Sequence, residues 1–186
     1  MMARTEPEWA LVTVLFADIR GFTTFADQAT AREAVLYLNE FFELVIPVLT
    51  RHGGQANKLL GDGLLGVFAT PDHADRAFEA SRNILSEVDA HFGERCRIGI
   101  GINSGLVLFG SIGGGELHEL GVIGDPVNVA ARVQDATRDL GEPLLLTEAT
   151  RRLLEGEQQT LDPRGELALK GKAQPVPVYA PRRVTA

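Results

Sequence analysis

The order of the periodic segments is the feature that most constrains the fold of this chain. Short apolar runs rich in β-forming residues alternate with longer segments in which apolar residues recur at helical spacing. The expected strands cover residues 11–17, 55–60, 64–69, 95–102 and 106–112, and the expected helices cover residues 31–49 and 72–92. This order predicts an α/β fold, an α+β sandwich with a ferredoxin-like βαββαβ core, whose single sheet carries helices on one face.

Local signals support these segments. Thr30 is placed to cap the first helix, and Pro47 is expected to disturb its last turn. The glycines on either side of Asp62 predict a tight turn that joins the second and third strands. A C-terminal extension follows, with helices expected at residues 127–137 and 148–154 and strands at residues 144–146, 165–169 and 176–179.

The length of 186 residues fits one domain. We assign residues 11–181 to this domain, residues 1–10 to a lead-in and residues 182–186 to a tail. Three consecutive glycines at residues 113–115 are expected to form a flexible tip.

Composition narrows the class of protein. The net charge of −7 argues against a nucleic-acid binder, because such proteins usually present a basic face to the phosphates. Cys96 is the single cysteine, which excludes an intrachain disulfide, and it lies in an alternating apolar run typical of a core residue. No apolar run reaches the roughly 18 residues of a membrane-spanning helix, and the first residues lack a signal-peptide pattern. We therefore expect a cytoplasmic chain, either complete or cut from a larger protein.

An acidic residue ends the first expected strand. Asp18 follows the apolar run, and a turn at Arg20 and Gly21 comes directly after it. A carboxylate at such a position is costly unless it meets a cation or hydrogen-bond donors, and the backbone N–H groups of a glycine-bearing turn can hold phosphate oxygens. An ordinary aspartate at a strand end fits this segment equally well.

A second aspartate, Asp62, lies at the expected hairpin tip. An Asp-Gly pair is a common turn signal, so Asp62 alone indicates only a turn. The hairpin should pair beside the first strand, however, and this pairing brings Asp18 and Asp62 to adjacent strand ends. Two carboxylates in that arrangement can hold divalent cations against a triphosphate.

Asn128 and Arg132 lie four residues apart on an expected helix, so they share one helical face. Pro126 suits the first turn of this helix, with Asp125 near its cap. An amide beside a guanidinium suits a sugar and a polyphosphate, although a solvated polar face explains the pair as well. The Lys-Gly-Lys segment at residues 170–172 is by itself a weak indication of any function.

Together these segments resemble the class III adenylyl and guanylyl cyclases over about residues 11–180. The motifs Phe-Ala-Asp-Ile-x-Gly-Phe-Thr, Lys-x-x-Gly-Asp, Gly-Asp-x-Val-Asn-x-Ala-x-Arg and Leu-Lys-Gly occur in that order, starting at residues 16, 58, 124 and 169. One such motif can arise by chance, whereas the four together are specific. The short sequence between them looks like that of a bacterial, mycobacterial-like member.

The resemblance implies a metal-dependent enzyme whose sites are shared between two chains. Asp18 and Asp62 would bind two Mg²⁺ or Mn²⁺ ions, with the carbonyl of Ile19 as a further ligand. In this family the metal ligands come from one chain and the remaining site residues from the other. A homodimer would therefore contain two equivalent sites.

The resemblance also implies the contacts with the nucleotide. The backbone of Gly21, Phe22 and Thr23 would hold the β- and γ-phosphates, Lys58 would read the base, Asn128 would bind the ribose, Arg132 would stabilise charge on the α-phosphate, and Lys170 would contact the outer phosphates. With ATP as the substrate, the products would be 3′,5′-cyclic AMP and pyrophosphate.

Two positions depart from the family pattern. Gly121 stands seven residues before Asn128, where adenylyl cyclases usually have Asp or Thr and guanylyl cyclases a small residue. Lys58 is the adenylyl-type partner, so the pair that selects the base is mixed and a guanylyl or dual-specificity cyclase is the alternative. Leu106 stands where some members have a phosphate-binding arginine.

Two rival interpretations remain. A diguanylate cyclase of the GGDEF type shares the fold class, and residues 113–117 resemble its motif, but they lie far from the expected metal-bearing strand. A non-catalytic cyclase-like regulatory domain that binds a nucleotide is the rival of another class. Degenerate members usually lose a metal aspartate, the asparagine or the arginine, and all four are present here.

Overall fold

All the strands in the described part of the chain belong to one sheet. The computed structural model describes residues 6–114, 117–156, 160–169 and 171–182, and only the backbone of residues 117–120. The strands are β1 (Glu8–Ile19), β2 (Gln55–Leu60), β3 (Gly63–Phe68), β4 (Ile98–Gly114), β5 (Leu117–Ile123), β6 (Leu144–Thr147), β7 (Leu161–Leu167) and β8 (Val176–Pro181). The helices are α1 (Phe22–Gln28), α2 (Ala31–Arg51), α3 (His73–Phe92), α4 (Asp125–Asp139) and α5 (Glu148–Arg151), with a short 3₁₀ turn at Gly93–Arg95.

Strand β1 lies inside the sheet between β3 and β4, and the strand order is β2-β3-β1-β4-β6-β8-β7, with β5 paired to β4. Strands β3 and β4 both run antiparallel to β1, and β6 runs parallel to β4. The elements β1, α2, β2, β3, α3 and β4 follow one another in the expected order. The predicted βαββαβ core with a C-terminal extension is therefore confirmed.

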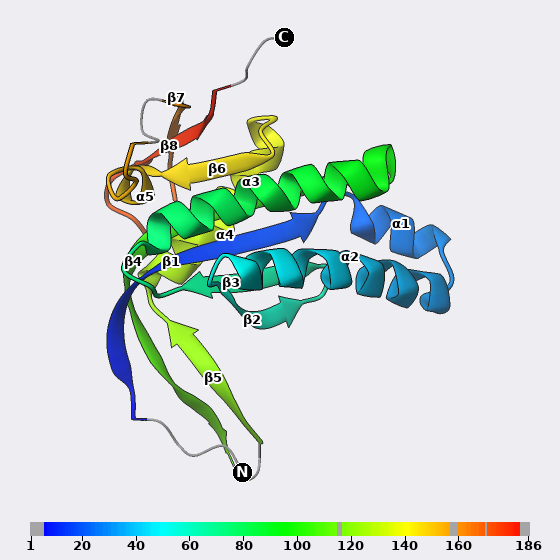
Figure 1. Cartoon of the computed structure of the whole chain (residues 1–186), viewed down its shortest axis with the longest axis horizontal. Helices are drawn as coiled ribbons and strands as arrows, with labels where there is room; N and C mark the ends of the chain where they lie inside the picture. Colours follow the sequence, from blue (N-terminus) through cyan, green and yellow to red (C-terminus); the bar gives the residue numbers. More distant parts are fainter. Residues whose placement is uncertain (1–5, 115–116, 157–159, 170, 183–186) are drawn as a thin grey trace.

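The side chains of β1 alternate between two hydrophobic clusters. Leu15, Ala17 and Ile19 pack with the residues of α2 and α3 on one face of the sheet. Val12 and Val14 join a cluster on the opposite face that includes Ala130 of α4. Helices thus cover both faces of the sheet, with α2 and α3 in front of β1 in Figure 1 and α4 behind it. The expectation of helices on one face holds for the core but not for the extension.

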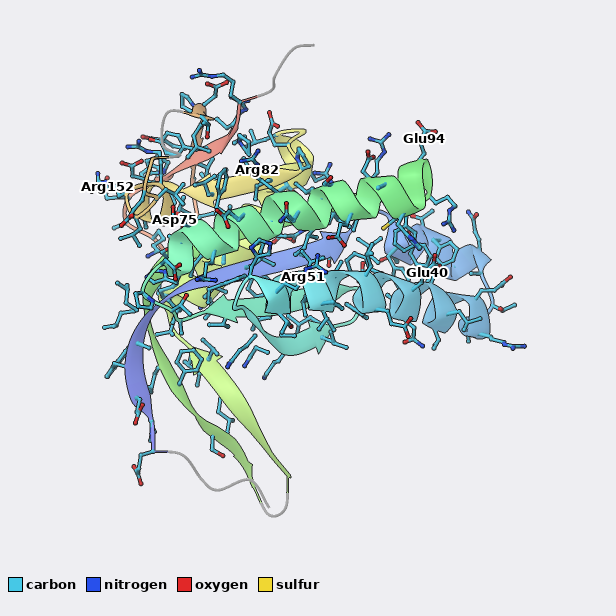
Figure 2. All side chains as sticks on the ribbon, viewed as in Figure 1. Glu40, Arg51, Asp75, Arg82, Glu94 and Arg152 are labelled. Carbon is cyan, nitrogen blue, oxygen red and sulfur yellow. The ribbon has the colours of Figure 1, made fainter. Side chains whose placement is uncertain are left out.

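Helix α2 begins as expected and ends later than expected. The side chain of Thr30 accepts a hydrogen bond from the backbone N–H of Glu33, whose carboxylate accepts one from the backbone N–H of Thr30. The helix continues past Pro47 to Arg51, where an exposed ion pair of 2.5 Å with Glu87 links α2 to α3. Figure 2 shows Arg51 between these two helices.

Strand β4 corrects the expectation of two strands at residues 95–102 and 106–112. It is continuous from Ile98 to Gly114. Gly105, which lies in the gap between the two expected strands, gives room to a neighbour, since a Cβ there would lie 2.5 Å from Cγ of Pro126. The sequence predicts only a flexible tip at residues 113–115 and no strand after it. In the structure, Gly113 and Gly114 belong to β4, and β5 follows. Residues 115 and 116 lie outside the described residues.

The first part of β1, the second part of β4 and β5 form a three-stranded arm that extends beyond the helices (Figure 1). Trp9, Leu11, Leu106 and Ile123 are each more than half exposed on this arm. The cross-strand pairs Leu11–Leu106, Trp9–Leu108 and Leu108–Ile123 place these side chains on one face of it. The arm therefore presents an apolar surface to its surroundings.

The buried Cys96 has no disulfide partner, as expected for a core residue. In the described residues, no helix has both the length and the apolar character that a bilayer crossing requires.

Candidate functional site

The sheet register places Asp18 and Asp62 side by side. Asp18 pairs with Gly63, the first residue of β3. Asp62 directly precedes Gly63 at the hairpin tip, so it lies next to Asp18 across the two strands. A Cβ at Gly63 would lie 3.0 Å from Oδ2 of Asp18, so the glycine leaves space for this carboxylate. Burial raises the pKa of Asp18 from 3.8 to about 6, and the charge of Asp62 acts in the same direction. Arg138 opposes this shift, whereas Asp135 adds to it.

These carboxylates form a set of hard oxygen donors in a partly desolvated place. Such a pair is unfavourable when both members are ionised, and a divalent cation removes this cost. Asp18 and Asp62 therefore fit a hard divalent cation such as Mg²⁺ or Mn²⁺. The carbonyl of Ile19 lies at the same end of β1, where the strand stops.

A cavity of about 230 Å³ adjoins Asp18 on the side of α4. Its other walls come from Arg20 and from the last turns of α4, residues 134–139. Nη2 of Arg20 donates hydrogen bonds to the backbone carbonyls of Thr137 at 3.0 Å and Glu142 at 2.7 Å. Arg20 therefore joins the end of β1 to the end of α4.

Asn128 and Arg132 lie toward the other end of α4. The sequence predicted that they share a face, and the helix from Asp125 to Asp139 contains both. Asn128 is exposed and Arg132 half-buried. Asp135, which lines the Asp18 cavity, follows Asn128 by seven residues. This spacing corresponds to about 10 Å along the helix axis. Along the axis of α4, Asn128 thus lies about two helical turns from the residues of the same helix that line the Asp18 cavity.

The first turn of α4 is held by contacts that the sequence did not reveal. The N-cap is Gly124, with no capping side chain, and Asp125 lies next to it as the first helical residue, as expected. The ammonium of Lys172 instead forms an ion pair with the carboxylate of Asp125. Lys172 belongs to the Lys-Gly-Lys segment, and that segment was the only signal for this contact. Lys170 lies outside the described residues.

A buried hydrogen-bond network also reaches this turn. Nδ2 of Asn103 donates to the carbonyl of Pro126 at 3.0 Å, and Oδ1 of Asn103 accepts from the hydroxyl of Thr147 at 2.6 Å. The Thr147 hydroxyl in turn accepts from the backbone N–H of Thr150. All three side chains are almost completely buried, so each bond replaces one that water would make.

The network continues to the other face of the sheet. The hydroxyl of Ser104 donates to that of Thr150 at 3.1 Å and lies 2.7 Å from the hydroxyl of Thr13. Thr13 lies 2.7 Å from Nδ1 of His73, the first residue of α3. Burial lowers the pKa of His73, which favours the neutral ring. The start of α3 is thus connected through the sheet to the start of α4.

The two candidate base-reading positions lie on strands that contact each other. Lys58 is half-buried on β2, and Gly121 is buried on β5 opposite Gly110. A Cβ at Gly121 would lie 2.0 Å from Cδ1 of Ile112, so the Ile112 side chain fills the space that a larger residue would need.

The expected turn at Arg20 and Gly21 is present, and helix α1 begins directly after it. Gly21 is the N-cap of α1 and has a φ of 74°, which favours glycine. A Cβ at Gly21 would meet nothing within 4 Å, so conformation rather than space accounts for the glycine. Phe22 and Thr23 form the first turn, where backbone N–H groups lack partners within the helix.

A family model described as the adenylate and guanylate cyclase catalytic domain matches residues 5–180. The chain belongs to the class III cyclase family. The uncharacterized protein Rv1320c of Mycobacterium tuberculosis is 34% identical over 175 residues, which are 91% of this chain and 31% of that protein. The cyclase domain thus spans about a third of the length of that relative.

Solved structures of both substrate types resemble the cyclase domain. A bacterial light-regulated adenylyl cyclase is 26% identical with a TM-score of 0.86, over 97% of this chain and 54% of that chain. The guanylyl cyclase Cya2 is 28% identical with a TM-score of 0.78, over 95% of this chain and 94% of that one. The similarity to these structures is therefore consistent with the family, but it does not distinguish adenine from guanine as the base of the substrate.

The raised pKa of Asp18 predicts that its carboxylate destabilises the fold of the cyclase domain without metal. The cost should be nearly absent at about pH 3, grow between about pH 4 and 6 as the carboxyl ionises in the unfolded state first, and be complete by about pH 7. The full shift corresponds to about 3 kcal/mol, which solvent screening of this half-exposed group reduces to about 1–2 kcal/mol. In a chelator at pH 7, Asp18→Asn should therefore be more stable than wild type by that amount.

Urea unfolding from about pH 3 to pH 8 measures this difference, which should nearly vanish at about pH 3. Asp27→Asn, at an exposed position on α1, is the matched control and should change little at any pH. Equal or lower stability of Asp18→Asn at pH 7 would contradict the prediction.

The buried network predicts a second stability effect. Thr147→Val keeps the side-chain shape but removes the donor to Oδ1 of Asn103 and the acceptor for the N–H of Thr150. We expect a loss of about 1–3 kcal/mol in urea unfolding, and faster amide hydrogen exchange in the first turn of α4. Thr50→Val, whose hydroxyl bonds an exposed carbonyl within α2, should lose much less. Unchanged exchange in α4 would show that the network does not hold that turn.

Proposed function

We propose that this domain is an adenylyl cyclase that converts ATP into 3′,5′-cyclic AMP and pyrophosphate. In this reaction the ribose 3′ oxygen forms a bond to the α-phosphorus, the bond from that phosphorus to the bridging oxygen of pyrophosphate breaks, and the 3′-hydroxyl proton is lost. Membership of the cyclase family supports the reaction class. The observation that carries the proposal is the adjacency of Asp18 and Asp62 at the end of the central strands.

Asp18 and Asp62, with the carbonyl of Ile19, would hold two divalent cations, Mg²⁺ or Mn²⁺. When bound, such cations activate an attacking oxygen and neutralise phosphate charge. The half-buried setting of Asp18 supports this role, because charges in a partly dry site act more strongly than in water. The backbone N–H groups at the start of α1, in Gly21, Phe22 and Thr23, would orient the outer phosphates.

The remaining contacts would come from a second copy of the chain. Asn128 would orient the ribose, and Arg132 would stabilise the charge that develops on the α-phosphate. Lys58 would donate to the base, and Lys170 would contact the outer phosphates. The separation of about two helical turns along α4 between Asn128 and the residues that line the Asp18 cavity supports this division.

The apolar arm supports a homodimer as the active form. Trp9, Leu11, Leu106 and Ile123 leave an apolar face uncovered in the single chain, and burial of such a face drives association. The arm is also continuous with β4, whose other end pairs with the strand that carries Asp18. Contact between arms would thus involve the same strands as the site.

The shared site predicts complementation between two inactive variants. Asp18→Ala lacks a metal ligand and Arg132→Ala lacks the charge partner, so each homodimer should lose nearly all cyclic AMP formation. A mixed dimer contains one site with both lesions and one intact site, so mixing should restore activity. With random mixing of equal amounts, about a quarter of the wild-type activity is expected, because half the dimers are mixed.

Cyclic AMP formation with Mn²⁺ and ATP measures this rescue, with mixed dimers confirmed by differently tagged chains. Wild-type activity per chain should also fall on dilution. Mixed dimers without activity would place all site residues in one chain. No turnover by the wild type with ATP or GTP, despite metal binding, would instead favour a regulatory domain.

Base selection is the finer part of the proposal. Lys58 presents only donors, which suit N1 of adenine and also O6 of guanine. Gly121 offers no side chain that accepts from the adenine amino group or repels the guanine oxygen. We infer that ATP is the preferred substrate with weak discrimination, and this inference makes a dual-specificity cyclase the second candidate.

An acidic residue at position 121 should sharpen the preference for ATP. The Ile112 side chain occupies the space beside Gly121, so Gly121→Asp is best combined with Ile112→Ala. The double variant should raise the ratio of kcat/KM for ATP over GTP by about tenfold or more relative to Ile112→Ala alone. Steady-state kinetics with both nucleotides measures this ratio, and an unchanged ratio would show that position 121 does not read the base.

A further inference from the structure

A second cavity, of about 430 Å³, lies between the last part of α3, the start of β4 and the loop that precedes β6. Its volume is within the range of small-molecule sites. Leu85 and Val88 from α3, Ile98 from β4 and Pro143 from the loop give it apolar walls. Glu94, labelled in Figure 2, marks the end of α3 next to this region. Neither the motifs nor the proposed reaction uses this cavity.

Two guanidinium groups line the same cavity. Arg20 and Arg97 both contribute to its wall, and the backbone N–H of Arg20 donates to the carbonyl of Arg97 at 2.7 Å. Within the guanidinium of Arg20, Nη2 donates both of the hydrogen bonds to other described residues. Nε of the same group is buried and has no partner among the described residues. The guanidinium of Arg20 is therefore incompletely used by the protein.

Acidic groups near the cavity offset only part of this charge. Asp89 on α3 also lines it, and Glu94 lies 3.8 Å from Nη2 of Arg97, in a pair whose side chains are both largely exposed. Arg138 adds a third positive charge that acts on Arg20. The cavity thus combines an apolar body with a cationic corner, which is the complement of an amphipathic anion.

We propose that this cavity binds a small organic carboxylate. Its apolar body would lie against Leu85, Val88 and Pro143, and its carboxylate would accept hydrogen bonds from Arg20 and Arg97. The inference rests on this cavity alone and does not depend on the reaction at Asp18.

Occupancy of this cavity would reach the cyclase site through Arg20. This residue also lines the cavity beside Asp18 and holds the end of α4 through the carbonyl of Thr137. A carboxylate that draws the guanidinium toward itself weakens its bonds to Thr137 and Glu142 and changes the charge beside Asp18. The site therefore has the position of an effector site.

The test compares octanoate with 1-octanol, which has the same apolar chain without the charge. Isothermal titration of the purified 186-residue chain should show saturable binding of one octanoate per chain, with 1-octanol at least about tenfold weaker. Arg97→Gln should weaken octanoate by about tenfold and leave 1-octanol unchanged, because one charge-assisted bond is lost. Arg95→Gln is the matched control, since its guanidinium packs over the ring of Phe92 outside the cavity lining.

Arg97 is the informative position because it is largely exposed, whereas Arg20→Gln removes bonds that hold α4 and can unfold the chain. Three outcomes overturn the proposal: no saturable binding of octanoate below about 10 mM, equal affinity for octanoate and 1-octanol, or unchanged octanoate binding in Arg97→Gln. These outcomes do not depend on turnover, so they are separate from a failure of the proposed cyclase reaction.

Discussion

The close contact between α4 and the backbone of β4 determines where Asn128 and Arg132 lie relative to the sheet. Glycines make this contact possible, because a Cβ at Gly101 would lie 2.2 Å from the backbone nitrogen of Gln134 and one at Gly99 would lie 2.2 Å from Oγ1 of Thr137. With the helix this close, its last turns form a wall beside Asp18 and its first turn reaches Asn103. A larger side chain at either glycine would push α4 away from the sheet. The last turns of α4 would then move away from Asp18, and its first turn would move away from Asn103.

Polar contacts then fix the helix at both ends. At its C-terminal end, Arg20 binds the carbonyl of Thr137, which satisfies an acceptor that the helix leaves open. At its N-terminal end, Asn103 binds the carbonyl of Pro126 and Lys172 pairs with Asp125. Apolar packing alone allows a helix to slide or rotate, whereas directional bonds at two ends allow one position. The side chains with candidate roles in chemistry therefore project from a helix whose place is set by residues with no such role.

Much of this arrangement could be predicted from the sequence. Helical and strand periodicity predicts the core elements, and the expected hairpin places Asp62 beside Asp18, as the register of β1 and β3 confirms. The two errors in the region of β4 lie at glycines: residues 105, 113 and 114 belong to this strand, although glycine is more typical of turns than of strand interiors. Contacts such as Lys172–Asp125 and Arg20–Glu142 join residues far apart in the chain, and no local sequence pattern predicts which residues pair.

The unbroken course of β4 has a mechanical consequence. Ile98 and Gly99, at one end of the strand, pair with Ile19 and Asp18, and the other end forms the arm. A hydrogen-bonded strand in a sheet transmits torsion along its length, whereas two strands joined by a loop would absorb it at the joint. A twist imposed on the arm would therefore reach the two carboxylates as a rotation of the sheet, and β4 would couple the apolar face of the arm to the proposed site.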